Sequence, residues 1–485
     1  MKLEQVRICD LDALKKHIHT RIPTIYTASK TSTVIPFELI EQERFHFRPV
    51  ATIARLVLAD LTMLPKRITL LENCLVRLEG AVTWEELRLF LKEQGLDLKV
   101  APTDESASVL GGVATAASGE RSFAFGNVRA QIVAVEFMDY KGEVQRLLRA
   151  KKLHSDALID FVPYQQKLAA YHQHHFKNPH APYMEYESDL MIGTEGQLGV
   201  IVAIEMEVTS LVDHSYFAIM LPRWEKGHFW HQQIFNFLQQ FCRKDNKDNT
   251  EEAPLVWAAE FLDANSLTLL RMSDQESVLK CIDNFPPDQD VLFLEVTSAA
   301  LDDFYDKLIA FFENENNESN EHVLSMDRIM QLPCEDYHCL RVAVPRTIQE
   351  SNARKGVTKK GTDLQVAAHD FPKLLDLYLE ARKIEESYLF GHFASAHLHF
   401  NFTPKSSDGH AISKCDQFLE ELYKKIALKK DPFVLCSPFA EHGVGVLKKK
   451  FMQDFYGEVE QELFKKLKDR YDPYRQFFPH GFMSL

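Results

Sequence analysis

The chain has 485 residues, of which 45% are hydrophobic and 26% charged, as in a globular protein too long for a single hydrophobic core, so two or three domains are expected. Its net charge of -14 argues against a nucleic-acid-binding protein, because phosphate groups require a basic face. The eight cysteines form no CxxC pair, which excludes a zinc ribbon and a four-cysteine iron–sulfur cluster and indicates reduced thiols. The sequence offers neither a secretory signal nor a run of roughly 18 apolar residues that would span a membrane.

The first part of the chain alternates between helix and strand patterns. Residues 11–20 have helical spacing, and "TIYTASKTSTVIPF" (24–37) predicts a strand, a loop of small residues and a second strand. Strands are expected in "RLVLADL" and "ITLLENCLVRLEG", followed by a helix for which Thr83 is the predicted N-cap. The alternation ends with "LGVIVAIEMEV" (198–208), a long strand of the buried type.

The middle of the chain, from 210 to 385, has a different character. Its predicted strands are "YFAIMLP", "VWAAEFL", "VLFLEVT" and "LRVAVP", and its predicted helices are "HFWHQQIFNFLQQFCRK" and "LDDFYDKLIAFFENE". The polar stretches 243–253 and 313–321 are predicted to be surface loops. Residues 386–485 return to strand and then helix, so the whole pattern is that of an α+β or α/β protein.

Two glycine-rich stretches and a histidine-rich strand are candidates for chemistry. The chain lacks GxGxxG after a strand and lacks GxxxxGK[ST], so neither a Rossmann site nor a P-loop is supported. Glycines in 110–129 and 191–202 lie beside strands, where backbone N–H groups either cradle a diphosphate or only form tight turns. "GHFASAHLHFNF" (391–402) carries three histidines, which fit a metal site, a buried polar cluster or an exposed strand.

Taken together, five stretches carry a resemblance that spans nearly the whole chain. They are "YTASKTST", "LGGVATAASGERSFAFGNVR", "MIGTEGQLGVIV", "GHFASAHLHFN" and "AEHGVGVLKKKFM". In this order they resemble the vanillyl-alcohol-oxidase type of FAD-binding oxidoreductase, in the branch of D-lactate dehydrogenases, glycolate oxidase and D-2-hydroxyglutarate dehydrogenase. The resemblance implies an α+β fold with a two-lobed FAD-binding domain (1–209), an inserted ferredoxin-like α/β cap (210–385) and a C-terminal segment (386–485) that returns to the flavin site.

The chain departs from the family pattern at several places, among them residues 394–396, which are ASA where the family has GDG. The first loop, residues 28–32, contains no glycine, although the family has several there. Val113 follows Gly112 directly where the family has Asn, and His480 precedes Gly481 where the family ends in NPG. About residues 151–175 form an insertion. These departures concern the FAD-binding part above all.

The resemblance also implies site residues. A divalent metal, most plausibly zinc by this donor set, would be held by His392, His399 and Glu441, with His442 as the catalytic base. Substrate would contact Arg341, Lys359 and His397, with Lys360 as the alternative to Lys359. His397 stands where the family has Asn, and its other possible roles are an added metal ligand, a hydrogen bond to the flavin or space filling. The implied FAD-binding residues are Ser29, Lys30, Thr31, Ser32, Pro102, Gly111, Gly112, Thr115, Gly119, Arg121, Gly193, Glu195, Gly196, Gly199, Val200 and Ile201.

The function implied by the resemblance is the oxidation of a small D-2-hydroxy acid, such as lactate, glycolate or 2-hydroxyglutarate, to the 2-oxo acid by hydride transfer to FAD with help from the metal. A quinone, a cytochrome or an electron-transfer flavoprotein would accept the electrons. The expected location is the cytoplasm, with or without peripheral contact to the inner face of a membrane. Two alternatives are an FAD transferase like alkyl-dihydroxyacetonephosphate synthase and a non-catalytic relative with weakened FAD binding.

Overall fold

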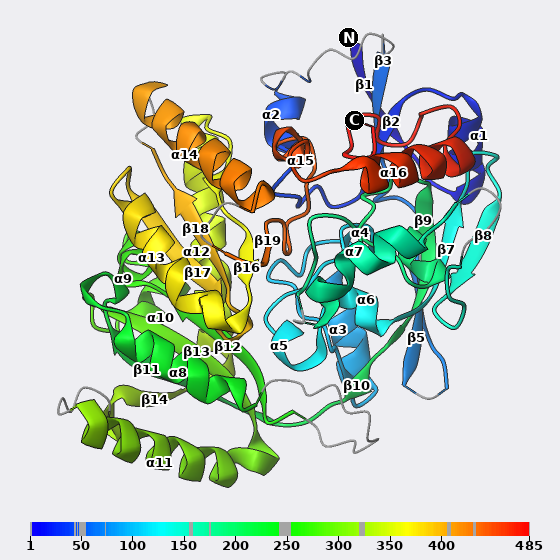
Figure 1. The fold of residues 1–485 in the computed structure, drawn as a ribbon. Coiled ribbons are helices and arrows are strands. Elements are labelled where there is room, and N and C mark those ends of the chain that lie inside the picture. Colours follow the sequence, from blue (N-terminus) through cyan, green and yellow to red (C-terminus); the bar gives the residue numbers. More distant parts are fainter. Residues whose placement is uncertain are drawn as a thin grey trace. The chain divides into compact units, whose positions relative to one another are not determined.

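The computed structural model describes residues 2–42, 45, 47, 55–72, 74–154, 159–173, 176–241, 254–319, 325–404, 409–429 and 433–484. The chain mixes helices and sheets, as predicted, and forms two compact units. Unit 1 comprises Met1–Ser118, Gly126–Leu211 and Phe439–Leu485, and unit 2 comprises Gly119–Phe125 and Val212–Pro438. The stretch predicted as one C-terminal segment, 386–485, is therefore divided between them. Figure 1 shows the elements in sequence colours.

Unit 1 contains a parallel three-stranded sheet in the order β1-β3-β2, an antiparallel five-stranded sheet in the order β4-β5-β9-β7-β8, and the short pair β10-β6. Its strands are β1 (Lys2–Arg7), β2 (Thr24–Thr27), β3 (Arg55–Asp60), β4 (Arg67–Leu70), β5 (Leu75–Glu79), β6 (Leu96–Asp97), β7 (Ile132–Met138), β8 (Val144–Leu148), β9 (Val200–Glu207) and β10 (Thr209–Ser210). Its helices are α1 (Leu11–His19), α2 (Phe37–Glu41), α3 (Trp84–Glu93), α4 (Val109–Ala114), α6 (Val128–Gln131), α7 (Val162–Gln173), α15 (Lys449–Met452) and α16 (Glu458–Tyr471).

Helix α3 begins where its sequence predicts. The Thr83 hydroxyl accepts from the backbone N–H of Glu86, and the Glu86 carboxylate accepts from the backbone N–H of Thr83, which together make a capping box. Leucines and Trp84 on one face are buried, so the helix is fixed both at its start and along its side.

The C-terminal stretch completes unit 1. Thr24 of β2 forms a parallel bridge with Phe477, which is fully buried against the parallel sheet. The Lys468 ammonium is buried and donates to the carbonyls of Gln197 and Phe477 and to the carboxylate of Asp472. Residues after 439 are thus as much a part of this core as the first strands are.

Unit 2 is built on one large sheet with the order β14-β11-β13-β12-β17-β18-β16-β19, and β15 also pairs with β18 (Figure 1). Its strands are β11 (His214–Pro222), β12 (Val256–Leu262), β13 (Gln289–Thr297), β14 (Ile329–Leu332), β15 (Lys360–Gly361), β16 (Leu364–Val366), β17 (Ser387–His392), β18 (His397–Phe402) and β19 (Cys436–Ser437). Its helices are α5 (Ser122–Phe125), α8 (Phe229–Gln239), α9 (Ala264–Leu270), α10 (Glu276–Ile282), α11 (Leu301–Ser319), α12 (Cys334–Lys355), α13 (Phe371–Arg382) and α14 (Gly409–Ala427).

The two faces of this sheet pack against different helices. On one face, Leu262 and Phe293 belong to a core that also includes residues of α9, α10 and α12. On the other face, Phe261 lies against Phe393, and Phe235 of α8 stacks on Phe371 of α13 with ring centroids 4.1 Å apart. The sheet is therefore buried on both sides, which explains its nearly continuous apolar strands.

Three local predictions are wrong. "LRVAVP" (340–345) is not a strand but lies inside α12, where Tyr337, Leu340 and Val344 are buried at helical spacing. The second strand expected in 34–37 is replaced by a bend that leads into α2. Residues 313–319 extend α11 instead of forming a loop. Short β-branched or polar runs carry too little periodicity to override a helix that is set by its ends and its neighbours. The other predicted loop, 243–253, lies outside the described residues.

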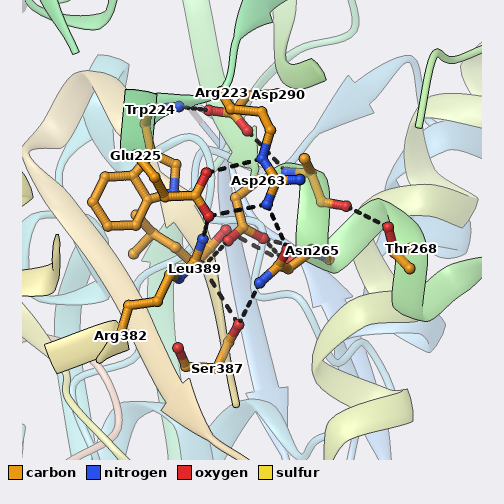
Figure 2. A network of polar contacts seen from close by, with 12 residues as sticks. Arg223, Trp224, Glu225, Asp263, Asn265, Thr268, Asp290, Arg382, Ser387 and Leu389 are labelled. Carbon is orange, nitrogen blue, oxygen red and sulfur yellow. Dashed lines mark hydrogen bonds and ion pairs between the residues drawn. The ribbon is translucent and has the colours of Figure 1, made fainter. Parts of the chain in front are cut away.

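A buried polar network fixes the start of β17 (Figure 2). The Asp290 carboxylate accepts from the backbone N–H groups of Trp224 at 2.7 Å and Ala264 at 2.8 Å. Asp263 caps α9 and forms an ion pair with Arg382, which also donates to the carbonyl of Ser387, the first residue of β17. Burial raises the pKa of Asp290 to about 8. Burial also raises the pKa of Asp263 to about 7, and the negative charge of the nearby Asp290 adds to this effect.

Candidate functional site

The glycine-rich stretches predicted to bind FAD lie next to each other in unit 1. Gly193 and Glu195 donate backbone N–H groups to the carbonyls of Val113 and Ala114, at 3.2 and 2.8 Å. The Asn178 amide donates to the carbonyls of Ala116 and Ala440. The stretches 110–119, 191–202 and 440–446 therefore meet, although up to about 330 positions separate them in sequence.

The first loop joins the same group of segments. The carbonyl of Val34 accepts from the backbone N–H groups of Val446 and Leu447, both at 3.1 Å. Ser29, Thr31 and Ser32 of this loop are partly buried, while the Lys30 ammonium pairs with the Glu41 carboxylate. A phosphate at this loop would have to compete with Glu41 for Lys30.

Glu195 has a role that the sequence did not suggest. Its carboxylate, predicted to bind FAD, accepts from the backbone N–H groups of Val444 at 2.6 Å and Gly445 at 3.1 Å. A side chain at Gly443 would come within 2.6 Å of the same carboxylate, so the glycine is required for this approach. Burial raises the pKa of Glu195 to about 7. Glu195 thus anchors the loop that carries Glu441 and His442.

The predicted FAD-binding glycines fall into two kinds. A side chain at Gly112 would meet the Trp84 ring nitrogen at 3.1 Å, so packing alone explains this glycine. A side chain at Gly111 would meet only Ser108 at 3.7 Å, and one at Gly196 only a carbonyl at 3.8 Å. Neither contact is close, so packing does not require glycine at these two positions, although the φ of +69° at Gly196 favours it. An uncrowded backbone at Gly111 leaves a cofactor room to approach, so the residues present fit an FAD site.

The remaining predicted FAD-binding residues lie around helix α4, at the start of strand β9, and in unit 2. Thr115 ends α4, its hydroxyl donating to the carbonyls of Gly111 and Gly112. Pro102 lies in the segment before α4, and Gly199, Val200 and Ile201 lie at the start of β9. Gly119 and Arg121 belong to unit 2.

Glu441, predicted as a metal ligand, is bonded within unit 1. Its carboxylate accepts from the Ser118 hydroxyl at 2.9 Å and from the Lys177 ammonium at 3.1 Å. Lys177 follows the insertion and its side chain is only 3% exposed. The ammonium balances the carboxylate charge, and a metal ion at Glu441 would have to tolerate or displace that cation. His442 is next to it and partly buried.

The three histidines of unit 2 lie together and are buried. His397 and His399 share a face of β18, and His392 pairs with His397 across the hairpin. The potential ligand atoms of the three side chains lie within 4.8 Å of one another. His392 contacts the Glu260 carboxylate through Nδ1 at 2.7 Å, and His397 contacts Asp363 through Nε2 at 2.9 Å. The buried-cluster and metal-site interpretations remain, while an exposed strand is excluded.

Glu260 and Asp363 are site residues that sequence reasoning missed. Both are buried, and neither stands in a motif: Glu260 is the one charged residue of "VWAAEFL", and Asp363 follows "KKGT". A lone acid in an otherwise apolar strand was the available signal, because a buried carboxylate needs a partner.

Arg341 and Arg121 belong to a buried ion network. Arg341, predicted to bind substrate, forms an ion pair with Glu120 at 2.6 Å, and Tyr337 donates to the same carboxylate at 2.9 Å. Arg121, predicted to bind FAD, pairs with Glu295 at 2.7 Å. Burial raises the pKa of Glu120 to about 7 despite its cationic partner. Both arginines thus have carboxylate partners in unit 2.

Lys359 and Lys360 were the two alternatives for a cation that binds the substrate, and the structure describes both. Lys359, the predicted substrate contact, is partly buried just before β15. The neighbouring Lys360 forms an ion pair with Asp416 at 2.7 Å, so its charge is matched.

The family model "FAD binding domain" matches residues 52–148, and the model "FAD linked oxidases, C-terminal domain" matches residues 250–480. No curated protein matches the chain. No helix among the described residues is both long and apolar enough to cross a membrane.

Solved structures that resemble the chain include alkyldihydroxyacetonephosphate synthase in two crystal forms. The P1 form has 12% identity and a TM-score of 0.55, covering 98% of this chain and 76% of that one. The P212121 form has 13% identity and a TM-score of 0.58, covering 98% and 75%. At such low identity the likeness shows the fold. The two family models, over residues 52–148 and 250–480, support the FAD-linked oxidase family for this chain.

Proposed function

We propose that the protein is an FAD-dependent dehydrogenase that oxidises a small D-2-hydroxy acid to the 2-oxo acid. The observation that carries the proposal is the buried group of His392, His397 and His399, which is held by two carboxylates in a domain of the FAD-linked oxidase type. Buried imidazoles of this kind can bind a metal or move a proton, and both are useful in removing the hydrogen of a hydroxyl group.

Each group has a proposed role. FAD, when bound, supplies the acceptor for the hydride that leaves the hydroxyl-bearing carbon. A divalent metal held by His392, His399 and Glu441 would polarise the substrate oxygens. His442 would take the hydroxyl proton. These roles of Glu441 and His442 remain predictions.

The substrate carboxylate requires a cation or a hydrogen-bond donor. Arg341, Lys359 and His397 remain the proposed contacts. Glu120 already matches the charge of Arg341, so a substrate carboxylate at Arg341 would have to share that cation with Glu120. Quinones, cytochromes and electron-transfer flavoproteins remain the proposed electron acceptors.

The test begins with flavin content and anaerobic substrate reduction. Purified protein should be yellow or should take up added FAD, and a D-2-hydroxy acid should bleach the flavin and reduce a dye. The panel is lactate, glycolate and 2-hydroxyglutarate, each as its available enantiomers. If no member of the panel bleaches the flavin of FAD-loaded protein, the dehydrogenase proposal is wrong.

A base variant with a matched control sharpens this test. His442→Ala should retain the flavin spectrum but lower the rate of bleaching by about a hundredfold or more. His369→Ala, at an exposed histidine in unit 2, should leave the rate unchanged. Equal rates in the two variants would remove His442 from the mechanism.

A second candidate function is a transferase of the alkyldihydroxyacetonephosphate synthase type. It is favoured by the structural similarity to that enzyme over 98% of the chain. Such an activity would form an alkyl-dihydroxyacetone phosphate with no net reduction of a dye. A preparation that stays colourless after incubation with FAD would instead support a non-catalytic relative.

A further inference from the structure

The histidines of unit 2 stand in a row that continues across four neighbouring strands. In the register of the sheet, Glu260 of β12 pairs with His392 of β17, His392 pairs with His397 of β18, and His397 pairs with Gln365 of β16. Directly paired residues project from the same face of a sheet, with Cβ atoms about 5 Å apart. An acid, two imidazoles and an amide thus form one polar line across these four strands.

A second row lies one repeat along the strands. His399 is two residues after His397 and shares its face. Asp363 directly precedes β16, where Leu364 pairs with Leu398, and its carboxylate lies 3.7 Å from Nδ1 of His399. The ring of His399 passes over Gly391, where a side chain would come within 2.9 Å of it. The backbone of β17 is therefore shaped to admit this third imidazole.

Two carboxylates determine how two of the rings are turned. Glu260 accepts from His392 at Nδ1, and Asp363 accepts from His397 at Nε2. An ionised carboxylate only accepts, so each of these ring nitrogens carries a hydrogen. In a neutral ring the lone pair then lies on the other nitrogen, Nε2 of His392 and Nδ1 of His397. Carboxylate partners of this type orient metal-binding histidines and raise their basicity.

The three imidazoles are close enough to share an ion. Their ring centroids lie 5.3 Å apart for His392 and His397, 5.6 Å for His392 and His399, and 4.6 Å for His397 and His399. Ligand atoms around tetrahedral zinc lie about 3.3 Å apart, given zinc–nitrogen distances of about 2 Å. The observed upper limit of 4.8 Å is within reach of small side-chain rotations.

We propose that His397 is a third imidazole ligand of one divalent metal, alongside His392 and His399, and that Glu260 and Asp363 are its positioning residues. The inference depends on the proposed function in one respect: both assume that His392 and His399 are ligands of the metal. Three neutral imidazoles leave the double charge of the ion to be offset by the two nearby carboxylates, which suits zinc or cobalt. With Nε2 on Asp363 and Nδ1 on the metal, His397 would have no ring nitrogen left for the substrate, so this role replaces the substrate contact proposed above.

The test measures metal binding without turnover. Protein stripped with a chelator is titrated with zinc against a chromophoric competitor, with the fold of each variant checked by circular dichroism. His397→Asn should weaken zinc binding by a hundredfold or more, and Asp363→Asn by about 10- to 100-fold. His369→Asn should bind as the original protein does.

X-ray absorption of the zinc-loaded original protein gives a second measurement that needs no variant. Three imidazoles at about 2 Å are expected. The inference is overturned if X-ray absorption finds only two imidazoles around the zinc. It is also overturned if His397→Asn binds zinc as tightly as the original protein while His392→Ala does not bind zinc. In that case the dehydrogenase proposal stands. If the original protein binds no zinc or cobalt, the inference and the metal part of the proposed function fall together, whereas flavin bleaching by a hydroxy acid still decides the oxidation itself.

Discussion

Replacing Glu195 by glutamine should stabilise the protein, and increasingly so as the pH rises. Glu195 is partly buried where the stretch 191–202 meets 440–446, and the burial of its carboxylate raises its pKa from 4.5 to about 7. A carboxyl whose pKa is higher in the folded state favours folding most when protonated. Its contribution is complete below pH 4.5 and is lost as the pH rises through 7.

The magnitude follows from this difference in pKa. Each tenfold change in a proton equilibrium is about 1.4 kcal/mol, so the ionised side chain costs the folded state about 3 kcal/mol at pH 8. In Glu195→Gln the amide oxygen can still accept from Val444 and Gly445, and the amide nitrogen takes the place of the acid hydroxyl. The variant therefore resembles the protonated acid at every pH.

The assay is thermal unfolding followed by circular dichroism at pH 5, 6, 7 and 8. Relative to the original protein, the variant should gain about 2 to 3 kcal/mol between pH 5 and pH 8, or about 5 to 10 °C for a unit of this size. Glu143→Gln, at an exposed glutamate of the same unit, should show no such trend. A difference between variant and original that stays constant from pH 5 to 8 would refute the reasoning.

Three further predictions concern unit 2 and the bound groups. Arg341→Ala should lower the free energy of unfolding in urea by about 3 to 5 kcal/mol, because it leaves Glu120 buried without its cation, and a smaller loss in Arg341→Ala/Glu120→Gln would confirm that cause. Ala396→Gly should raise the free energy of unfolding in urea by up to about 1 kcal/mol, since Ala396 has a φ of 50° that glycine adopts without strain, and a lower free energy of unfolding would contradict this. Treatment with a chelator should abolish dye reduction while the flavin absorbance remains, and full activity in metal-free protein would exclude the metal.

Strands and helices that are set by local patterns could be predicted from the sequence. Thr83 and Glu86 stand at the spacing of a capping box, and "VWAAEFL" is a continuous apolar run that became a strand buried on both faces. The spacing of His397 and His399 likewise placed them on one face of a strand. Such features depend on a few neighbouring residues and need no knowledge of the fold.

What depends on distant partners could not be predicted. Glu260 is 132 positions from His392, and only the pairing of β12 with β17 brings them together. The expected substrate role of Arg341 rests on the family resemblance, which does not indicate its ion-pair partner Glu120, more than 200 residues earlier. Glu195 was assigned to the cofactor for the same reason. A motif indicates which residues matter but not which neighbour each one contacts.

The division of the chain between the two units has a consequence for its synthesis. The chain leaves unit 1 after 118, returns after 125, leaves again after 211 and comes back after 438. A ribosome therefore completes all of unit 2 before it has delivered Phe477, which bridges to Thr24. The core of unit 1 cannot be completed until the last segment of the chain has been synthesised, so part of the apolar surface of the first 211 residues stays uncovered until then. Chaperone dependence during translation, and aggregation of chains that stop near 438, are the expected costs of this order of assembly.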